Sequence, residues 1–363
     1  MPHFVQEPPH AHGTPPKTGI LLINLGSPEA ATPGAVRAYL REFLSDPAVV
    51  EIPRPVWWLI LNLFVLTTRP KASAQRYAQV WMPEGSPLKV HTERQAVLLR
   101  GYLGERLKQP HVVDHAMRYG NPSIRSRLEA LKAQGCDRIL LLPLYPQYSA
   151  STTATALNAA YAALATMRNQ PALRTVRHFH DDEGYIKAIA QNINDYWMKN
   201  HRGDHLVLSF HGVPRRTLDL GDPYHCECLK TGRLIIEQLG VKPEFCTIAF
   251  QSRFGRAEWL KPYTAEVLTG LAKKKTGRVD VVCPGFVSDC LETLEEIALE
   301  AKAEFLNAGG RELHYIPCLN ERDDWMHALT GIVLKNLLGW TAGPSAENLK
   351  TSREHALRLG AKT

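Results

Sequence analysis

The chain has 363 residues, 44% of them hydrophobic and 22% charged, with a formal net charge of +7 at pH 7. This length predicts two domains of similar size, and the positive excess suits an anionic partner such as an acidic membrane surface or a carboxylate-bearing ligand. Nucleic acid ranks low as a partner because the sequence contains no zinc finger, no RNA-binding aromatic motif and no dense run of Lys and Arg.

Residues 1–17 are expected to form a disordered tail. They are rich in Pro and His and lack the apolar core of a secretory signal. Without an export signal, the seven scattered cysteines are interpreted as reduced thiols of a cytoplasmic protein.

Short apolar runs alternate with helical patterns along the rest of the chain. The first half contains four predicted strands, at 20–25, 112–118, 138–144 and 174–179, with helices such as 122–134 and 151–166. The second half repeats this order, with strands at 206–210, 247–251, 279–283 and 313–316 and helices at 226–239, 262–274, 290–306 and 324–338. We therefore predict an α/β protein of two Rossmann-like, doubly wound domains, each a parallel sheet of about four strands flanked by helices. The halves share no sequence repeat, so the predicted symmetry is one of architecture.

The domain boundary is expected near 179–184, where polar and turn residues cluster. The predicted domains span 18–180 and 181–323, a final helix at 324–340 packs back on the N-terminal domain, and 341–363 forms a peripheral tail. Ligands of open parallel sheets bind at the carboxyl ends of the strands, often between domains. Polar residues that directly follow strands are therefore the candidates for a site.

The segment 55–67, PVWWLILNLFVLT, is almost wholly apolar. A membrane span needs about 20 residues, so this segment is too short to cross. One interpretation is a buried core helix, and the other is a lip that dips into the bilayer surface, flanked by the cations Arg54, Arg69 and Lys71. Helical spacing spreads the large side chains around the helix, and paired tryptophans suit a membrane interface, so we predict the lip. Those side chains are Trp57, Trp58, Leu61, Phe64 and Leu66.

His211 directly follows an apolar strand and precedes a glycine. This position places the imidazole at the carboxyl end of the strand, facing a predicted cleft. A single histidine there is, by itself, more often a loop residue bonded to nearby backbone.

An acidic stripe follows the strand that ends near Pro284. At 100° per residue, one helical face collects Asp289, Glu292, Glu296 and Glu300. A plain amphipathic helix with a solvated face explains this pattern without function. The position after a strand favours acidic oxygens that guide a divalent cation.

Other candidates are weaker. The run His225–Cys228 resembles a metal hook but lacks a second pair at zinc-site spacing. The group formed by His178, His180, Asp181 and Asp182 could chelate a metal, although a helix-capping turn explains it better. No Gly-rich phosphate motif is present.

Taken together, these segments resemble the ferrochelatase family from about residue 18 to 340. Eight segments stand in the family's order and spacing: LLINLGSPE (21–29), EGSPL (84–88), MRYGNPSI (117–124), LPLYPQYSASTT (142–153), SFHGVP (209–214), GDPY (221–224), FQSRFGRAEWLKP (250–262) and CPGFVSDCLETLEE (283–296).

The resemblance implies roles for the matched residues. His211 is implied to abstract pyrrole protons or bind metal, and Glu292 to face it across the porphyrin. Asp289 and Glu296 are implied to line an acidic metal path on a π-bulged helix. The remaining implied residues contact the porphyrin wall or its edge: Leu25, Ser86, Arg118, Tyr119, Trp259 and Phe286.

The resemblance also implies an activity, a lyase that inserts Fe²⁺ into protoporphyrin IX, releases two protons and completes haem synthesis. Alternatives are a related chelatase that uses coproporphyrin or cobalt, and a non-catalytic two-lobed tetrapyrrole-binding protein. The preceding oxidase of the pathway is an implied partner. The net charge and the segment 55–67 separately predict a cytoplasmic protein that associates peripherally with an anionic membrane surface. The implied oligomeric state is a monomer or weak dimer.

Two departures from the family bear on cofactors. Ala150 stands where animal enzymes carry a cysteine that helps hold a [2Fe-2S] cluster, and no cysteine follows Cys318. We therefore expect no [2Fe-2S] cluster and no permanently bound cofactor, with Fe²⁺ as a substrate. Cys290 replaces a histidine of some relatives, which argues against a metal-ligand role at that position.

Overall fold

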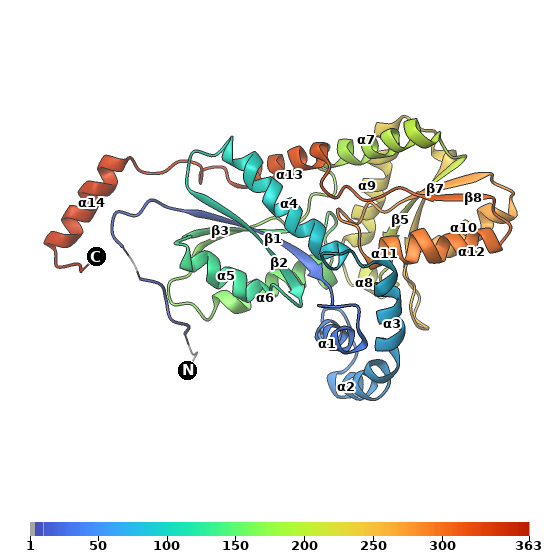
Figure 1. Cartoon of the computed structure of the whole chain (residues 1–363), viewed down its shortest axis with the longest axis horizontal. Coiled ribbons are helices and arrows are strands. Elements are labelled where there is room, and N and C mark those ends of the chain that lie inside the picture. The colour runs from blue at the N-terminus through green and yellow to red at the C-terminus, as the bar shows by residue number, and fades with distance from the viewer. Residues whose placement is uncertain (1–3, 10, 363) are drawn as a thin grey trace.

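Two four-stranded parallel sheets form the framework of the chain in a computed structural model that describes residues 4–9 and 11–362 (Figure 1). The first sheet has the order β2-β1-β3-β4 and contains β1 (Thr18–Gly26), β2 (His111–Tyr119), β3 (Arg138–Pro143) and β4 (Ala172–Thr175). The second has the order β6-β5-β7-β8 and contains β5 (His205–His211), β6 (Cys246–Gln251), β7 (Arg278–Val282) and β8 (Glu312–Tyr315). The predicted architecture of two parallel α/β sheets is confirmed.

The central strands are apolar along their whole length because helices cover both faces of each sheet. In β1, the four side chains from Ile20 to Ile23 are fully buried, and β3 beside it is buried from Ile139 to Leu142. The first sheet is covered by α4 (Pro87–Gly104), α5 (Ile124–Ala133) and α6 (Thr155–Leu164). The second is accompanied by α8 (Arg215–Asp219), α9 (Tyr224–Leu239), α10 (Thr264–Lys273) and α12 (Lys302–Asn307).

Two helices connect the sheets: α7 (Glu183–Asn200) and α13 (Asp323–Asn336) pack on each other, α7 also on α9 and α13 also on α4. Their contact is aromatic: Tyr185 of α7 meets Trp325 of α13 edge-on at 6.0 Å between ring centroids, and Phe179 from the preceding loop packs on both rings. Through the contact of α13 with α4, the helix predicted at 324–340 packs back on the first sheet's helices.

The strand predicted at 174–179 ends earlier than expected, at Thr175. Val176 makes the last bond of the ladder, from its N–H to the Leu141 carbonyl at 2.9 Å. Beyond it the chain turns so that Phe179 can enter the aromatic cluster, which leaves His178 and His180 in a loop.

The apolar segment 55–67 follows α1 (Pro33–Leu44). It comprises most of α2 (Arg54–Ile60), the π-helix Leu61–Val65 and the first two residues of α3 (Leu66–Val80). Figure 1 shows α1 and α2 projecting below the sheets. Trp57 is buried and its indole N–H donates to the Leu44 carbonyl at 2.6 Å. On the other side Trp58 is 62% exposed and Phe64 64% exposed. Within the part of the chain that the structure describes, no helix is long and apolar enough to span a bilayer.

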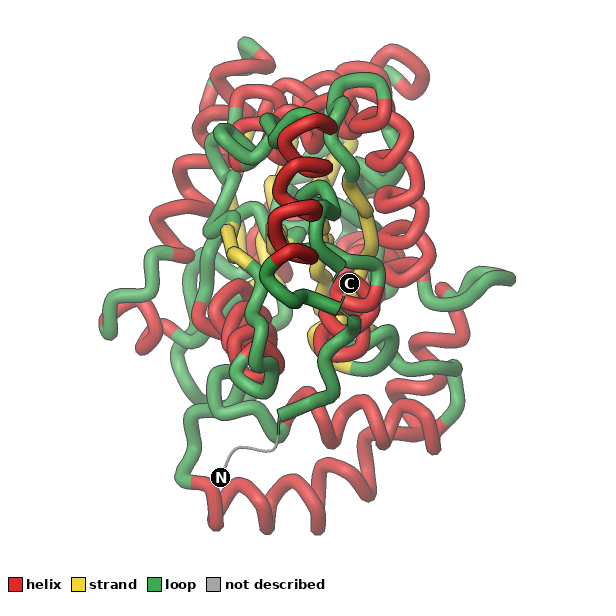
Figure 2. The backbone as a smooth tube through the Cα atoms, turned by 90° about the vertical axis from the view of Figure 1, so that its left-hand side faces the viewer, coloured by secondary structure: helices red, strands yellow, loops and turns green. Residues whose placement is uncertain are grey.

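The N-terminal segment, expected to be disordered, contacts the first sheet's loops. Val5 N–H donates to the Thr166 carbonyl at 2.9 Å, and Glu7 accepts from Asn169 N–H at 3.0 Å. Gly13 approaches α14 (Ala346–Arg358), the C-terminal helix that stands in front in Figure 2. Residues 1–3 and 10 of the expected tail lie outside the described residues.

Candidate active site

His211 ends β5, as the sequence predicted, and its surroundings fix the state of the ring. Its Nδ1 lies 2.7 Å from the Gly212 carbonyl oxygen, which can only accept, so Nδ1 carries the proton and donates. In the neutral ring, Nε2 therefore keeps its lone pair. The Tyr224 hydroxyl donates to the His211 carbonyl at 2.9 Å and holds the strand end in place.

Two aromatic residues named by the resemblance lie beside this histidine. The Phe286 ring meets the imidazole edge-on at 6.5 Å between centroids. Trp259 packs against Gly212, where an added Cβ would lie 2.6 Å from the Gln251 carbonyl and 3.1 Å from the indole. Glycine is therefore required at position 212 for the strand end and Trp259 to approach each other.

The acidic helix is not the continuous helix predicted at 290–306. It consists of α11 (Leu291–Leu294), the π-helix Glu296–Ala301 and α12, and Glu300 N–H donates to the Glu295 carbonyl at 2.9 Å, five residues back. The π-bulge implied by the resemblance is confirmed, and the uniform 100° stripe is wrong. The π turn takes more residues than an α turn, so Glu300 leaves the stripe and pairs instead with Arg76 of α3 at 3.4 Å.

Glu296 is held by two residues that sequence reasoning missed. Its Oε2 accepts from Ser252 Oγ at 2.6 Å and from Gln251 Nε2 at 3.4 Å. Gln251 is the last residue of β6 and Ser252 follows it, and this position at the carboxyl end of a strand is the signal that could have identified them. Ser252 has φ 65°, a strained conformation for a residue other than glycine that is typical of functional sites.

Burial raises the pKa of Glu296, and the neighbouring Glu292 adds to this rise. The Ser252 hydrogen bond and the nearby His211 act in the opposite direction but do not cancel it. Glu292 and His211 are thus both close enough to Glu296 to act on its charge.

Glu292 lies between the second sheet and the helices α1 and α3. Its backbone carbonyl accepts from Gln251 Nε2 at 2.8 Å. The pKa values of Tyr39 on α1 and Tyr77 on α3 are raised well above normal, first by burial and also by the Glu292 carboxylate. These two tyrosines were not identified from the sequence.

Asp289 is already occupied by protein donors. Its Oδ1 accepts from the Tyr315 hydroxyl at 2.5 Å and from Thr293 Oγ1 at 3.1 Å, and its Oδ2 accepts from Asn320 Nδ2 at 2.6 Å. This geometry makes Asp289 an anchor for the start of the acidic helix. The metal role predicted for it would require these bonds to open.

Arg118 and Tyr119, at the end of β2, meet at Asp46, another residue that the sequence did not reveal. Arg118 Nη2 lies 2.5 Å from Asp46 Oδ2, and the Tyr119 hydroxyl donates to the same oxygen at 2.9 Å. Burial acts to raise the pKa of Asp46, but hydrogen bonds, the largest from Thr155, and the Arg118 charge outweigh it and lower that pKa.

The last two predicted contact residues lie apart from this pair. Leu25 is half-buried near the end of β1. Ser86 is buried at the start of α4 and lines a pocket of about 520 Å³ whose lining residues include neither His211 nor Glu292. The structure thus brings together His211, Trp259, Phe286, Glu292 and Glu296, and places Ser86 in a separate pocket.

All seven cysteines are free. Cys283, Cys290 and Cys318 are buried, and their pKa values are raised well above normal, first by burial and also by the charge of Asp289. Cys226 on α9 is exposed.

Comparisons with known proteins agree along the whole chain. The family model described as Ferrochelatase matches residues 17–337. A curated protein named Ferrochelatase from Chromobacterium violaceum is 61% identical over 341 residues, which cover 94% of each chain. Those from Aromatoleum aromaticum and Nitrosomonas europaea are 58% and 56% identical, with full coverage of both chains.

Among solved structures, SirB from Bacillus subtilis with Fe³⁺ is similar in fold. It superposes with a TM-score of 0.55 at 14% identity and covers 88% of this chain and 95% of its own. At this identity, the likeness concerns the fold alone.

Proposed function

The chain belongs to the ferrochelatase family and inserts Fe²⁺ into protoporphyrin IX, and we propose that His211 and Glu292 carry out this reaction, with Glu296 beside them. The chain is thus a lyase that releases two protons in the final step of haem biosynthesis, with porphyrin and iron as substrates. The observation that carries the proposed site is the position of Gln251. It is paired with His211 in the neighbouring strand, and its Nε2 donates to the Glu292 carbonyl at 2.8 Å and to Glu296 Oε2 at 3.4 Å.

Insertion requires removal of two pyrrole protons and of the water shell of the metal. His211 offers Nε2 as the acceptor, since Nδ1 is committed to the Gly212 carbonyl. The carboxylates of Glu292 and Glu296 replace water molecules in the coordination shell of the cation and take up protons. The raised pKa of Glu296 makes this carboxylate the better proton acceptor. In this proposal Asp289 contributes by anchoring the helix and becomes a ligand only if its hydrogen bonds open.

We further propose that Leu25, Tyr119, Trp259 and Phe286 form the porphyrin walls. Ser86 and Arg118 are proposed for the porphyrin edge and its carboxylates. Arg118 Nη2 lies 2.5 Å from Asp46 Oδ2. To bind a porphyrin carboxylate, the guanidinium must therefore contact both carboxylates at once or release Asp46. A wall that bends the macrocycle would expose its nitrogen lone pairs to the metal.

The experiment that tests the activity is steady-state kinetics with protoporphyrin and coproporphyrin side by side, each with Fe²⁺ and with Co²⁺. The highest kcat/KM is expected for protoporphyrin and Fe²⁺. A clear preference for coproporphyrin or for cobalt would instead support a related chelatase. Porphyrin binding without turnover under any condition would support a binding protein.

The segment 55–67 is proposed as a lip that rests on an anionic membrane surface at the cytoplasmic side. Its exposed apolar side chains support this, because a folded chain rarely leaves several large apolar groups together in water. They are Val56, Trp58, Leu59, Leu63 and Phe64. Of the flanking cations, Lys71 is exposed, whereas Arg69 stacks on the Phe254 ring at 4.0 Å.

Two variants separate the lip from a core helix. Trp58→Ser with Phe64→Ser is expected to weaken binding to phosphatidylglycerol vesicles and to raise KM for porphyrin, with an unchanged Tm. Trp57→Ser, on the buried side, is expected to destabilise the fold by about 3–5 kcal/mol. Loss of folded protein in the exposed double variant would contradict the lip proposal.

Cofactor content and partners complete the proposal. With Ala150 in the cluster position, we propose that the protein carries no [2Fe-2S] cluster and no permanent cofactor, works as a monomer or weak dimer, and receives porphyrin from the preceding oxidase. Iron and sulfide analysis of the purified protein tests the first part. Acid-labile sulfide in the protein, lost in Cys226→Ser or Cys228→Ser, would contradict it.

A further inference from the structure

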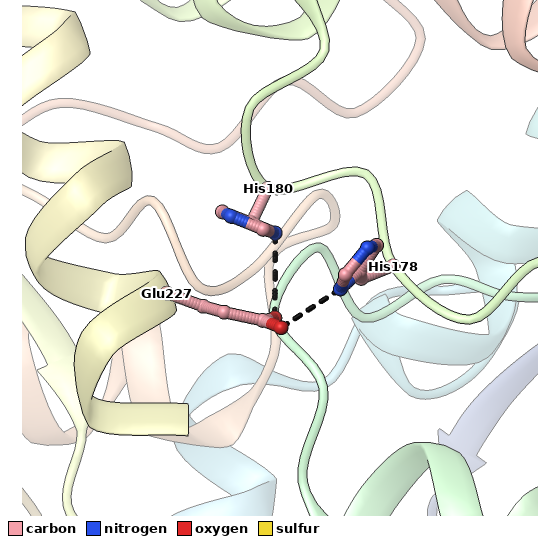
Figure 3. Close-up of side chains that lie close together, drawn as sticks. All are labelled: His178, His180 and Glu227. Atoms are coloured by element: carbon pink, nitrogen blue, oxygen red, sulfur yellow. Dashed lines mark hydrogen bonds and ion pairs between the residues drawn. The ribbon is translucent and has the colours of Figure 1, made fainter. Parts of the chain in front are cut away.

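Three potential metal ligands meet outside the proposed active site, where the chain crosses from the first sheet to the second. His178 and His180 follow β4, and Glu227 lies in the first turn of α9. The two histidines come from the group at 178–182 and the glutamate from the run at 225–228. Each of these motifs was weak on its own, and the fold brings them together (Figure 3). A ligand atom from each of the three side chains lies within 4.8 Å of the other two.

Both imidazoles direct Nδ1 toward the same carboxylate. His178 Nδ1 is 2.7 Å from Glu227 Oε1, and His180 Nδ1 is 3.3 Å from Glu227 Oε2. The second contact lacks hydrogen-bond geometry, so the buried Nδ1 of His180 has no hydrogen-bond partner among the described residues. His180 is only 5% exposed, and a buried polar atom without a partner is costly.

The groups around the cluster resemble those that orient metal ligands. His180 Nε2 faces Asp181 Oδ2 at 3.8 Å, on the side of the ring away from Glu227. Lys230 Nζ in turn lies 2.5 Å from Asp181 Oδ2 and holds that carboxylate in place. Metal-bound histidines commonly direct their second ring nitrogen toward such a carboxylate.

The cluster is also accessible. His178 lines a surface pocket of about 320 Å³ whose charged residues are Asp181, Asp182, Glu183 and Lys335. The side chain of His178 is 34% exposed, whereas that of Glu227 is 8% exposed. A cation can therefore reach the cluster from the side of His178, while Glu227 behind it is mostly shielded from water.

We propose that His178, His180 and Glu227 bind a divalent first-row transition-metal ion at a site separate from the porphyrin site. Two imidazoles and one carboxylate suit Zn²⁺, Fe²⁺ or Co²⁺ better than Mg²⁺ or Ca²⁺, which prefer oxygen ligands. Coordination through Nδ1 would give the unpartnered atom of His180 a partner.

The ion would fasten the crossover segment to α9. Glu227 Oε2 also accepts from Tyr148 N–H at 2.7 Å, so the loop after β3 joins the same point. One helical turn earlier, Tyr224 of α9 holds the His211 carbonyl. The bound metal therefore stabilises the helix that supports the strand end of the active site.

The test uses Co²⁺ and Zn²⁺ without porphyrin, on the full chain carrying His211→Ala and Glu292→Gln to remove the proposed central ligands. This parent is expected to bind about one Co²⁺ with visible d–d absorption. Adding Glu227→Gln or His178→Ala should weaken that binding by at least about 10-fold. His355→Ala, on the exposed face of α14, is the matched control and should bind as the parent does.

Thermal unfolding gives a second readout. Saturating Zn²⁺ is expected to raise the Tm of the parent and of the His355→Ala control by several degrees, and to leave the His178→Ala variant unchanged. Circular dichroism checks that each variant is folded. Because His178 is partly exposed, His178→Ala is expected to stay folded even if Glu227→Gln is unstable. Equal Co²⁺ affinity and equal Zn²⁺-induced Tm shifts in parent and ligand variants would overturn the proposal.

Discussion

The two sheets place the same local structure at the same positions but equip it with different side chains. A π-helix follows β3 at Ala150–Ala154, and another follows β7 at Glu296–Ala301. The first reads ASTTA, without a charge, and the second reads EIALEA and carries Glu296 and Glu300. The scaffold is thus repeated, while the acidic chemistry is confined to the second sheet. Fold and function are separable within one chain.

The outer strands show a second contrast. Val176 N–H bonds to β3 and Ile316 N–H bonds to β7 in the same way, at 2.9 and 2.8 Å. After β8, Cys318 N–H and Asn320 close on Asp289 by hydrogen bonds within the second half. After β4, the histidines instead meet Glu227 from the other half, and Nδ1 of His180 has no hydrogen-bond partner within the described part of the chain. The hydrogen-bonding groups of the loop after β8 are thus paired within the second half, whereas the loop after β4 presents ligands for the proposed ion.

The largest expected effect tests whether chemistry is confined to the second sheet. His211→Ala should lower kcat by about 10²–10⁴-fold, the usual contribution of a general base. Porphyrin affinity, measured by fluorescence quenching, should change little because apolar walls supply most of it. The control is His225→Ala on neighbouring α9. Near-normal turnover in His211→Ala would contradict the assignment.

The paired π-helices offer the next test. Glu292→Gln removes one charge next to the acidic π-helix with little change in shape, and kcat should fall by about 10²-fold. Thr152→Ala in the neutral π-helix should leave kcat within about twofold of wild type. Similar losses in both variants would show that the two edges contribute alike.

The smallest effect concerns stability and pH. The pKa of Glu296 in the folded protein is raised above its ordinary 4.5, chiefly by burial. Between 4.5 and this raised value the folded state binds more protons than the unfolded chain, so the carboxyl group lowers stability as pH rises through that interval. Glu296→Gln should therefore gain Tm relative to wild type as pH increases, with a constant gain above the interval. A difference in Tm that does not vary with pH would contradict the burial of this charge.

Eight apolar runs predicted eight strands because fully buried parallel strands are continuous in hydrophobicity. The same property predicted that His211 would stand at a strand end. The end of β4 was misplaced, because Phe179 is as apolar as a strand residue but packs on Trp325 instead.

The site's supporting residues were beyond single-sequence reasoning for a different reason. Asp46 binds Thr155 from 109 positions away, and Ser252 binds Glu296 from 44 positions away. His178 and Glu227 are 49 positions apart. Neither periodicity nor local spacing encodes such pairs, since they arise when loops at the carboxyl ends of different strands converge. The acidic stripe failed in part because the π turn altered the angle per residue.

The burial of the cysteines has a practical consequence for labelling. A thiol whose pKa is raised stays protonated at neutral pH and reacts slowly, and burial blocks reagents as well. Burial raises the pKa values of Cys136 and Cys246 to about 11, and it also raises those of Cys228, Cys283, Cys290 and Cys318 well above the ordinary value. A maleimide dye should therefore modify the native chain at Cys226 first. That residue adjoins Glu227, so its fluorescence can report metal binding at the crossover without any engineered cysteine.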